Sequence, residues 1–552
     1  MEIKDAIIKN MDHLGLVAGM IDELKIVESI DKSLPSLSKK KNISYGESVK
    51  AMILNGLGYV NKQLYLTPLF FKDKPLKRLF GKDMDALWFN DDTLGRTLDK
   101  LFDCGVSELY EKIAQKALKV LGLAPSTIHL DSTSFHFDGK YSNQEKKANE
   151  DEKVPVTITK GYSRDHHPEL NQIVLNMITE HQAGIPIWMQ PANGNQADTQ
   201  AFTTIIKEHI ASMKKALKTP IKVISDAASF SAKTIEEFKK NDMLFISRVP
   251  AKLKEAKEIL QYHKQEDFIK LDENYQAIAY IVEYKGMKQQ WILYKSSYAK
   301  SKEDKTIQKE YQKKQEKETK LLSKLQKKAY YCEEDANKAL QEITDKLQTL
   351  SIISKKLITK AKYKSKGRPK TEAIPQYHEY YWEIETQPNQ EYLQKEQNQK
   401  GGLFILATND MKLSAQELLY EYKSQQRIER GFRFLKSPQF LSDAMFLKSP
   451  KRIEAMLMIM TLSLLVYSAL EYKIRKELKT KNKTFPNQLG KPIQNPTARW
   501  IFENFFAIHL LIVESYEQVI GLNERHRLIL ELLGNIYMQF YGLASKKAVE
   551  EN

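Results

Sequence analysis

Two aspartates stand where apolar segments end, and this placement suits the binding of a divalent cation. Asp131 directly follows an apolar segment that ends at Leu130, and Asp226 follows a similar segment that ends at Ser225. Burying a carboxylate without a partner is costly, so each aspartate either caps a local turn with its side chain or holds a cation. Mg²⁺ prefers one or two carboxylates together with water and phosphate oxygens. Two such aspartates on adjacent strands could therefore share a hard cation.

A third carboxylate, Glu429, lies in a basic segment that is expected to be one helix over residues 421–437. In that helix Tyr422, Gln425 and Glu429 would share one face. Lys436 follows Glu429 by seven residues and returns to the same face. A solvated helix face is the ordinary explanation of such a polar stripe. The alternative is a site for a phosphodiester beside a metal ion, in which the carboxylate holds the ion while the phenol and the cations hold phosphates.

A basic segment with the sequence KGRPK is a further candidate for contact with nucleic acid. Lys366, Arg368 and Lys370 belong to a Gly-Arg-Pro core of the kind that enters a narrow A·T-rich minor groove. The alternative is a basic loop that contacts phosphates without reading sequence. Residues 92–122, with Gly105 between two expected helices, are compatible with a helix-turn-helix or with an ordinary helical hairpin.

Histidines near the first aspartate allow another interpretation, a transition-metal site. His129 and Asp131 share one face of the expected strand, whereas His136 has the opposite parity. Residues 165–167, Asp-His-His, form a second such group. Histidines at such places more often orient other ligands or lie in turns, so this site is the weaker alternative. No phosphate-binding loop of the GxxxxGKS type occurs in the sequence, so nucleotide hydrolysis is not expected.

The elements that would position these residues follow from the spacing of apolar residues. Residues 1–125 show helical spacing, with Ser44 as the expected cap of one helix. Between 126 and 250 the pattern changes: STIHLDSTSFHFDG is expected to be strand, turn, strand, and two further strands flank Gly184. Strands that alternate with helices predict an α/β domain with a mixed sheet.

The next region interrupts this pattern. Residues 251–400 contain two expected paired strands, AIAYIVEY and QQWILY, and a long charged helical arm. From 401 to 552 a buried strand, a long helix with Glu429 and apolar C-terminal helices are expected. We therefore predict a helical, DNA-binding region over 1–125, the first part of an α/β core over 126–250, an insertion over 251–400 and the second part of the core over 401–552.

Composition favours a polyanion as partner. The 552 residues carry a formal net charge of +16 and a pI of about 9.2, although a well-solvated surface is the alternative explanation. Two cysteines exclude a disulfide framework and a four-cysteine zinc site. The N-terminal residues do not form a signal peptide. The apolar segment 455–470 has sixteen residues, short of the ~20 that a membrane span needs, so a buried core helix is expected.

The polar stripe on the expected 421–437 helix resembles a family signature. Tyr422-x2-Gln425-x3-Glu429-x6-Lys436 is similar to the Tyr-x2-Arg-x3-Glu-x6-Lys pattern of a large group of bacterial insertion-sequence transposases, the insertion-sequence-four superfamily. Gln425 departs from the pattern, because Arg is usual there. The segment GYSRDHHPELNQIVL, from residue 161, resembles a Gly-His-Ser-Lys-Asp-His-Arg-Pro-Asp-Leu block of one subgroup, the 1634-type elements. The resemblance covers most of the chain.

The resemblance implies a ribonuclease-H-like catalytic core that is interrupted by the insertion. Asp131, Asp226 and Glu429 would be the catalytic Asp-Asp-Glu triad. They would also be the ligands of two Mg²⁺ ions, with Mn²⁺ as a substitute. The family cuts DNA at the terminal inverted repeats of its element and joins the freed 3′ ends to target DNA.

The resemblance also implies partners and a location. Tyr422, Gln425 and Lys436 would hold DNA phosphates near the cut, and Gln425 would hold them more weakly than Arg because it brings no charge. Double-stranded DNA is the expected partner, bound by a homodimer that holds two ends, in a bacterial cytoplasm and associated with the nucleoid. The alternatives are a metal-dependent nuclease that does not join strands and a DNA-binding protein whose triad has decayed.

Overall fold

The computed structural model divides the chain into two compact units. It describes residues 6–35, 42–58, 62–139, 141, 153–163, 167–217, 220–364, 374–400, 402–437 and 447–543. Unit 1 consists of Met1–Ser247 and Leu419–Asn552, and unit 2 consists of Arg248–Leu418. The predicted insertion covers 251–400, inside unit 2, and the helices before 125 belong to the same unit as the α/β core.

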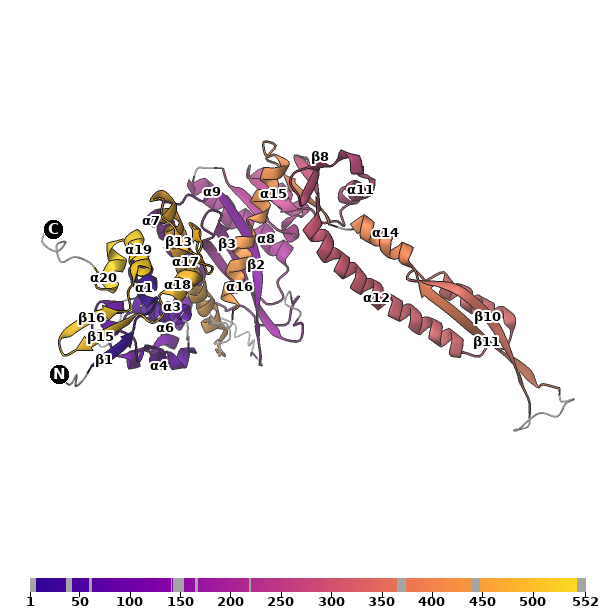
Figure 1. Ribbon diagram of the computed structural model, residues 1–552, viewed down its shortest axis with the longest axis horizontal. Helices are drawn as coiled ribbons and strands as arrows, with labels where there is room; N and C mark the ends of the chain where they lie inside the picture. The colour runs from indigo at the N-terminus through magenta and orange to yellow at the C-terminus, as the bar shows by residue number, and fades with distance from the viewer. Residues whose placement is uncertain are drawn as a thin grey trace. The chain divides into compact units, whose positions relative to one another are not determined.

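A mixed sheet forms the centre of unit 1, with the strand order β4-β3-β2-β5-β6 (Figure 1). β2 pairs antiparallel with β3 and β3 pairs antiparallel with β4, whereas β5 lies parallel to both β2 and β6. This arrangement confirms the predicted mixed α/β fold class. The strands are β2 (Thr127–Phe137), β3 (Asn171–Glu180), β4 (Pro186–Ala192), β5 (Lys222–Ser225) and β6 (Leu244–Arg248).

β2 is one continuous strand, so the predicted strand-turn-strand over STIHLDSTSFHFDG is wrong. β2 pairs with β3 from Ile128↔Glu180 to Phe137↔Asn171 without interruption. The small polar residues that suggested a turn are buried inside the sheet: Ser132, Thr133 and Ser134 are at most 5% exposed. Pairing with β3 and burial in the sheet therefore outweigh the turn preference of these residues. The two strands predicted around Gly184 are confirmed as β3 and β4.

Helices pack around this sheet. Tyr110 on α7 (Val106–Leu121) donates a hydrogen bond to the carbonyl oxygen of Pro186 on β4 over 2.8 Å, which ties this helix to the sheet edge. The helices within the α/β region are α8 (Asp198–Ile205), followed without a break by a π-helical segment (Ile206–Ile210) and α9 (Ala211–Leu217), and α10 (Ala232–Lys240). α8, the π-helical segment and α9 thus form one helical stretch with a π-helical turn in its middle.

The N-terminal helices are α1 (Leu14–Glu23), α2 (Ile26–Ser33), α3 (Tyr45–Leu57), α4 (Thr67–Phe71), α5 (Leu76–Phe80), α6 (Asp91–Cys104) and α7 (Val106–Leu121). The predicted cap is confirmed, because Ser44 and Glu47 form a reciprocal capping box at the start of α3. Gly105 alone separates α6 from α7 and has a φ of 98°, which favours glycine.

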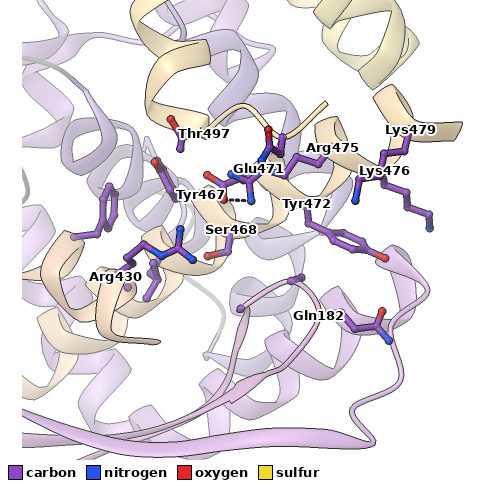
Figure 2. Close-up of a pocket in the computed structure, with 16 residues that line it drawn as sticks. Gln182, Arg430, Tyr467, Ser468, Glu471, Tyr472, Arg475, Lys476, Lys479 and Thr497 are labelled. Carbon is purple, nitrogen blue, oxygen red and sulfur yellow. Dashed lines mark ion pairs between the residues drawn. The ribbon is translucent and has the colours of Figure 1, made fainter. Parts of the chain in front are cut away.

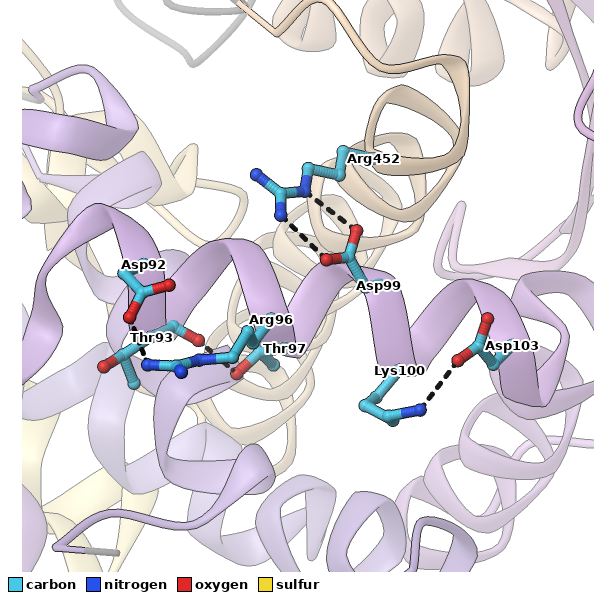
Figure 3. Close-up of polar contacts among 8 residues, drawn as sticks. All are labelled: Asp92, Thr93, Arg96, Thr97, Asp99, Lys100, Asp103 and Arg452. Atoms are coloured by element: carbon cyan, nitrogen blue, oxygen red, sulfur yellow. Dashed lines mark hydrogen bonds and ion pairs between the residues drawn. The ribbon is translucent and has the colours of Figure 1, made fainter.

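The core helix of unit 1 is α17 (Pro450–Thr480). It is long and apolar enough to cross a membrane, but 89% of its most apolar 18-residue window is buried inside the protein, as expected for a core helix. Arg452 of α17 forms a bidentate ion pair with Asp99 of α6, with N–O distances of 2.8 and 2.7 Å (Figure 3). Two parallel N–H···O bonds fix the crossing of these helices more firmly than one contact would.

The two ends of the described chain share a small sheet with the order β1-β15-β16. β1 (Ile7–Asn10) pairs antiparallel with β15 (His509–Val513). The prediction that residues before 125 and after 452 are helical is therefore wrong in part. The remaining C-terminal elements are β13 (Phe485–Pro486), β14 (Pro492–Ile493), α18 (Ala498–Asn504), β16 (Tyr516–Ile520), α19 (Glu524–Leu533) and α20 (Asn535–Phe540).

Unit 2 combines a group of strands with a long helix and a hairpin. Its strands lie in the order β12-β9-β8-β7, and β10 pairs with β11 in a separate ribbon that packs on α12 (Figure 1). The predicted strand pair is confirmed as β8 and β9, and the charged arm is helical. The elements are α11 (Lys254–Tyr262), β7 (Ile269–Lys270), β8 (Tyr275–Tyr284), β9 (Met287–Ser296), α12 (Ser297–Lys327), α13 (Glu333–Thr344), β10 (Leu350–Lys362), β11 (Tyr377–Pro388), α14 (Gln390–Lys400) and β12 (Leu403–Thr408).

Candidate active site

Asp131 lies within β2, at the point where this strand leaves its parallel partner. The last residue pair between β2 and β5 is Leu130↔Ser225, and Asp131 comes next while still facing Met177 of β3. The Ser132 backbone N–H donates to Asp131 Oδ1 over 2.7 Å. That bond orients the carboxylate locally, and the half-buried side chain is anchored in the centre of the sheet.

Asp226 follows the last residue of β5 and caps the short 3-10 helix Ala227–Ser229. Its Oδ1 accepts a hydrogen bond from the backbone N–H of Ala228 over 3.0 Å. Its carbonyl oxygen accepts bonds from the hydroxyls of Ser229 and Ser247, each over 2.8 Å. The buried serines therefore hold the backbone of Asp226 in place, and the cap that the sequence allowed as an alternative does form.

The register of β2 and β5 brings the two aspartates together. Leu130 pairs with Ser225, so Asp131 and Asp226 are the next two residues on neighbouring parallel strands. Asp226 keeps an extended backbone, with φ −76° and ψ −177°. Neighbouring strands lie about 4.8 Å apart and residues in register point to the same face. Both carboxylates therefore belong to one face of the sheet at one level.

Glu429 lies on a different element from the one predicted. The expected single helix over 421–437 is wrong: the structure has α15 (Ala415–Lys423) and α16 (Gln426–Leu435), separated by a turn at Ser424 and Gln425. Glu429 occupies the first turn of α16 and is exposed. α16 runs along β2 and also contacts α17 (Figure 1).

The other signature residues lie on both sides of the turn. Tyr422 belongs to the last turn of α15, Gln425 precedes the first residue of α16, and Lys436 follows its last residue. All three side chains are half-buried. Since the helix is interrupted between Tyr422 and Glu429, the ideal spacing that placed these residues on one face does not apply across the turn.

A buried histidine, His129, and a half-buried one, His181, hold this turn against the sheet. The Ser424 hydroxyl lies 3.2 Å from His129 Nε2 and 3.2 Å from His181 Nδ1. The same two imidazole nitrogens are 3.0 Å apart, and the rings stack with centroids 5.2 Å apart. His129 shares the strand face of Asp131, two residues away. The turn before the Glu429 helix is thus attached next to the aspartates, a contact that sequence reasoning missed.

The histidines that the structure describes do not assemble a transition-metal site. His129 contacts His181 and Ser424, whereas His136 contacts the Ser163 hydroxyl over 3.1 Å and packs edge-on to the ring of His167. Across the described ranges, no group of three or more His, Cys, Asp or Glu side chains is arranged to hold a metal ion, so Glu429 is not gathered with Asp131 and Asp226 into a three-carboxylate site. Residues 165 and 166 of the Asp-His-His group lie outside those ranges.

The donor set beside the turn suits a hard cation. Asp131 and Asp226 offer two carboxylates at one level of the sheet, and Mg²⁺ takes one or two protein carboxylates and completes its shell with water and phosphate oxygens. Neither histidine of the Ser424 contact is needed for such a shell. The basic segment with Lys366, Arg368 and Lys370 lies outside the described residues.

A basic cavity of about 540 Å³ lies next to α16 and is here called the α17 cavity (Figure 2). Its walls come from α16, α17, the turn between β3 and β4 and the segment before α18. Sequence reasoning missed it, although the run of basic residues that ends α17 is a signal that could have been followed. Its charged lining residues are Arg430, Glu471, Arg475, Lys476 and Lys479.

A buried carboxyl group on α17 has a strongly shifted pKa. Burial raises the pKa of Glu454 to about 7, although the backbone N–H of Val156, which donates to its Oε1 over 2.5 Å, partly opposes the shift. The segment 153–163 that contains Val156 is linked to β3, where Thr159 pairs with Gln172. The protonation state of Glu454 on α17 is therefore coupled to its hydrogen bond with the segment 153–163 beside the sheet.

Comparisons with known proteins identify the family. A model described as "Transposase DDE domain" matches residues 123–466, and a "Domain of unknown function (DUF4277)" matches residues 6–115. No curated protein matches the sequence. A cryo-EM structure of the piggyBac transposase synaptic complex with hairpin DNA is 10% identical, with a TM-score of 0.37 and coverage of 99% of this chain and 85% of that chain. Since the DDE model matches more than half of the 552 residues, the chain belongs to the transposase DDE domain family.

Proposed function

We propose that this transposase binds the terminal inverted repeats of an insertion sequence, cleaves DNA there and joins the 3′ ends to target DNA. The observation that supports the proposal is the register of β2 and β5, in which Asp131 and Asp226 directly follow the last paired residues, Leu130 and Ser225. Membership of the DDE family supports the assignment of transposition chemistry.

The sheet supports a ribonuclease-H-like core. β2 is the first strand of this sheet in the chain and carries Asp131, the parallel strand β5 ends directly before Asp226, and a subsequent helix carries Glu429. These are the places that such a core assigns to the acidic triad. Assignment to the insertion-sequence-four superfamily, and to its 1634-type subgroup, rests on the signature residues and is part of the same proposal.

Asp131, Asp226 and Glu429 would hold two Mg²⁺ ions, or Mn²⁺ in their place. When bound, the ions supply Lewis-acid activation of the attacking oxygen and stabilisation of the leaving oxygen. The protein's own contribution is positioning: backbone N–H groups orient both aspartates, and the Ser424 contact holds the start of the Glu429 helix near β2. Phosphoryl transfer depends largely on such positioning and on electrostatics.

Tyr422, Gln425 and Lys436 would hold DNA phosphates near the reacting bond. The phenol and the amide donate hydrogen bonds, and the ammonium group adds charge. Lys366, Arg368 and Lys370 would add a DNA contact from the basic segment. The helices α6 and α7 are candidates for reading the repeats. We also propose that two copies act together on two DNA ends, in the cytoplasm of a bacterium and on its nucleoid.

The experiment that tests this function uses the full chain, Mg²⁺, a labelled duplex ending in the inverted repeats that flank the coding region, and a supercoiled plasmid. We expect cleavage at the repeat ends and covalent joining of the labelled 3′ end to the plasmid. Cleavage without a joined product would mean that the protein is a nuclease that does not join strands. Binding without cleavage would leave a DNA-binding protein whose catalytic site has decayed.

A further inference from the structure

The α17 cavity has the charge of an anion site. Four cationic side chains and one carboxylate line it, a formal surplus of three positive charges. Arg475 is held in place, because its Nη1 pairs with Glu471 over 2.7 Å and its Nε donates to the Pro496 carbonyl over 2.8 Å. Lys476 and Lys479 are exposed. A concave surface of one sign concentrates its field and attracts counter-ions.

The cavity is more than a basic helix end. Cations at the end of a helix favourably offset its dipole, which would explain Lys476 and Lys479 alone. Arg430, however, belongs to α16, and its exposed guanidinium faces the same cavity (Figure 2). Ser468 and Tyr472 add hydroxyl groups to the lining. Cations from two helices together with neutral donors are the groups that hold phosphate oxygens in protein–DNA interfaces.

The cavity also lies beside the proposed catalytic helix. Arg430 follows Glu429 directly and points about 100° further around α16. Gly431 lets α16 approach α17 closely, since a Cβ at this position would lie 3.1 Å from Leu464 Cδ2. A DNA strand held at Glu429 would therefore continue along α16 towards the cavity.

We infer that the α17 cavity binds backbone phosphates of duplex DNA next to the reacting bond, with Arg430, Lys476 and Lys479 as the contacts. The inference rests on the proposed function and adds a DNA site outside the signature residues. Phosphate contacts position the DNA and carry no sequence information. The cavity therefore anchors any duplex equally, whereas recognition of the repeats comes from other parts of the chain.

The test is fluorescence anisotropy of labelled duplexes with the full chain, without divalent metal, over a range of KCl concentrations. The Lys476→Gln/Lys479→Gln variant should bind more weakly to a repeat duplex and to an unrelated duplex by the same factor. Its slope of log affinity against log salt should fall by about one unit for each lysine removed. The Lys476→Arg/Lys479→Arg variant keeps both charges and should retain the wild-type slope.

A matched control is the Lys215→Gln/Lys240→Gln variant, which removes two exposed lysines from α9 and α10, outside the cavity. It should bind as the wild type does. An unchanged slope in Lys476→Gln/Lys479→Gln would overturn the inference, and so would an equal loss in the control. A wild-type protein that neither binds nor cuts repeat duplexes would instead overturn the proposed function.

Lysine acetylation of the wild-type protein provides a second measurement that needs no variant. Duplex DNA should protect Lys476 and Lys479 from acetylation while Lys215 and Lys240 stay reactive. Equal modification of Lys476 and Lys479 with and without DNA would contradict the inference even if the variants failed to fold. Inorganic phosphate at the concentration of the DNA phosphates should give little protection, because free phosphates lack the linked charges of a duplex.

Discussion

At the scale of single residues, the two aspartates combine a structural and a proposed chemical role. Asp131 and Asp226 each accept a backbone hydrogen bond through Oδ1, Asp131 inside a strand and Asp226 as a helix cap. A cap fixes the direction of the carboxylate, so the same bond that satisfies the group also orients it. The sequence predicted both carboxylates and the strand end before Asp226, but it placed Asp131 at a strand end, whereas Asp131 lies inside β2. It could not predict their register, because register depends on the pairing of strands 95 residues apart.

Gln425 is the residue where the signature departs from the family pattern, and its replacement is a direct test of the phosphate role. Gln425→Arg should bind duplex DNA more tightly than the wild type, with a log-log salt slope steeper by about one unit, because Arg adds a charge to the contact. Anisotropy titrations measure both quantities. The matched control is Gln426→Arg at the exposed neighbouring position. An equal gain in both variants would contradict a specific role for position 425.

Glu454 predicts how stability depends on pH. Burial raises the pKa of the Glu454 carboxyl group from 4.5 to about 7. Between these two pH values, the folded state keeps a proton that the unfolded state has lost. The corresponding contribution to the free energy of unfolding, about 3 kcal/mol, is fully present below pH 4.5 and is lost as the pH rises through about 7. Urea unfolding between pH 5 and pH 8 should show this decrease. Glu454→Gln should remove it, whereas Glu531→Gln on the exposed part of α19 should retain it.

At the scale of elements, the largest error of sequence reasoning concerns the Glu429 helix. The segment 421–437 contains no proline, and its one glycine lies beyond Glu429, so local propensity predicts a continuous helix. The structure breaks it at Ser424, whose hydroxyl bonds back to the Glu421 carbonyl and approaches His129 and His181. Such side-chain bonds compete with the helix ladder. Because His129 and His181 lie far from Ser424 in the chain, no local pattern could reveal the break.

The hairpin of unit 2 depends on one buried carboxylate. Glu318 of α12 is 4% exposed and accepts hydrogen bonds from the backbone N–H groups of Gln348, Thr349 and Leu350 and from the Thr349 hydroxyl, over 2.7 to 3.1 Å. These bonds attach the start of β10 to α12. Bonds to a charged acceptor contribute about 1.5–3 kcal/mol each.

Glu318→Gln should loosen this attachment, because the amide nitrogen cannot accept the bonds that the second carboxylate oxygen receives. We expect faster hydrogen exchange of the amides at 348–350 by about tenfold or more, equivalent to about 1.4 kcal/mol or more. Exchange of peptides from the full chain measures this effect. Glu316→Gln, at an exposed position on the same helix, is the control. Unchanged exchange in Glu318→Gln would show that the carboxylate does not hold the hairpin.

At the scale of the whole molecule, the fold class could be predicted from the sequence, but not all of the strand pairings could. The mixed α/β core, the charged helix and the core position of α17 were predictable because each has a strong local pattern. The pairing of β1 with β15 was not, because its partners, such as Asn10 and His509, are 499 residues apart and each strand is short. The four predicted regions and the helix-turn-helix stay predictions.

The net charge of +16 agrees with a partner that carries many phosphates, and the family assignment makes DNA the natural candidate. We propose more specifically that Asp131, Asp226 and Glu429 act together on one phosphodiester. Loss of any one carboxylate should then abolish strand cleavage but leave DNA binding, since the phosphate contacts come from other residues. A purely structural role would lower folding and binding together.

The most direct measurement is the rate of Mg²⁺-dependent cleavage of a repeat duplex by Asp131→Asn, Asp226→Asn and Glu429→Gln, with DNA affinity measured in parallel. Each variant should lose about a thousandfold in rate, equivalent to about 4 kcal/mol of transition-state stabilisation, and keep wild-type affinity. Asp138→Asn, at an exposed carboxylate just beyond β2, should cleave normally. Cleavage at the wild-type rate by any of the three site variants would contradict the assignment of that residue to the catalytic site.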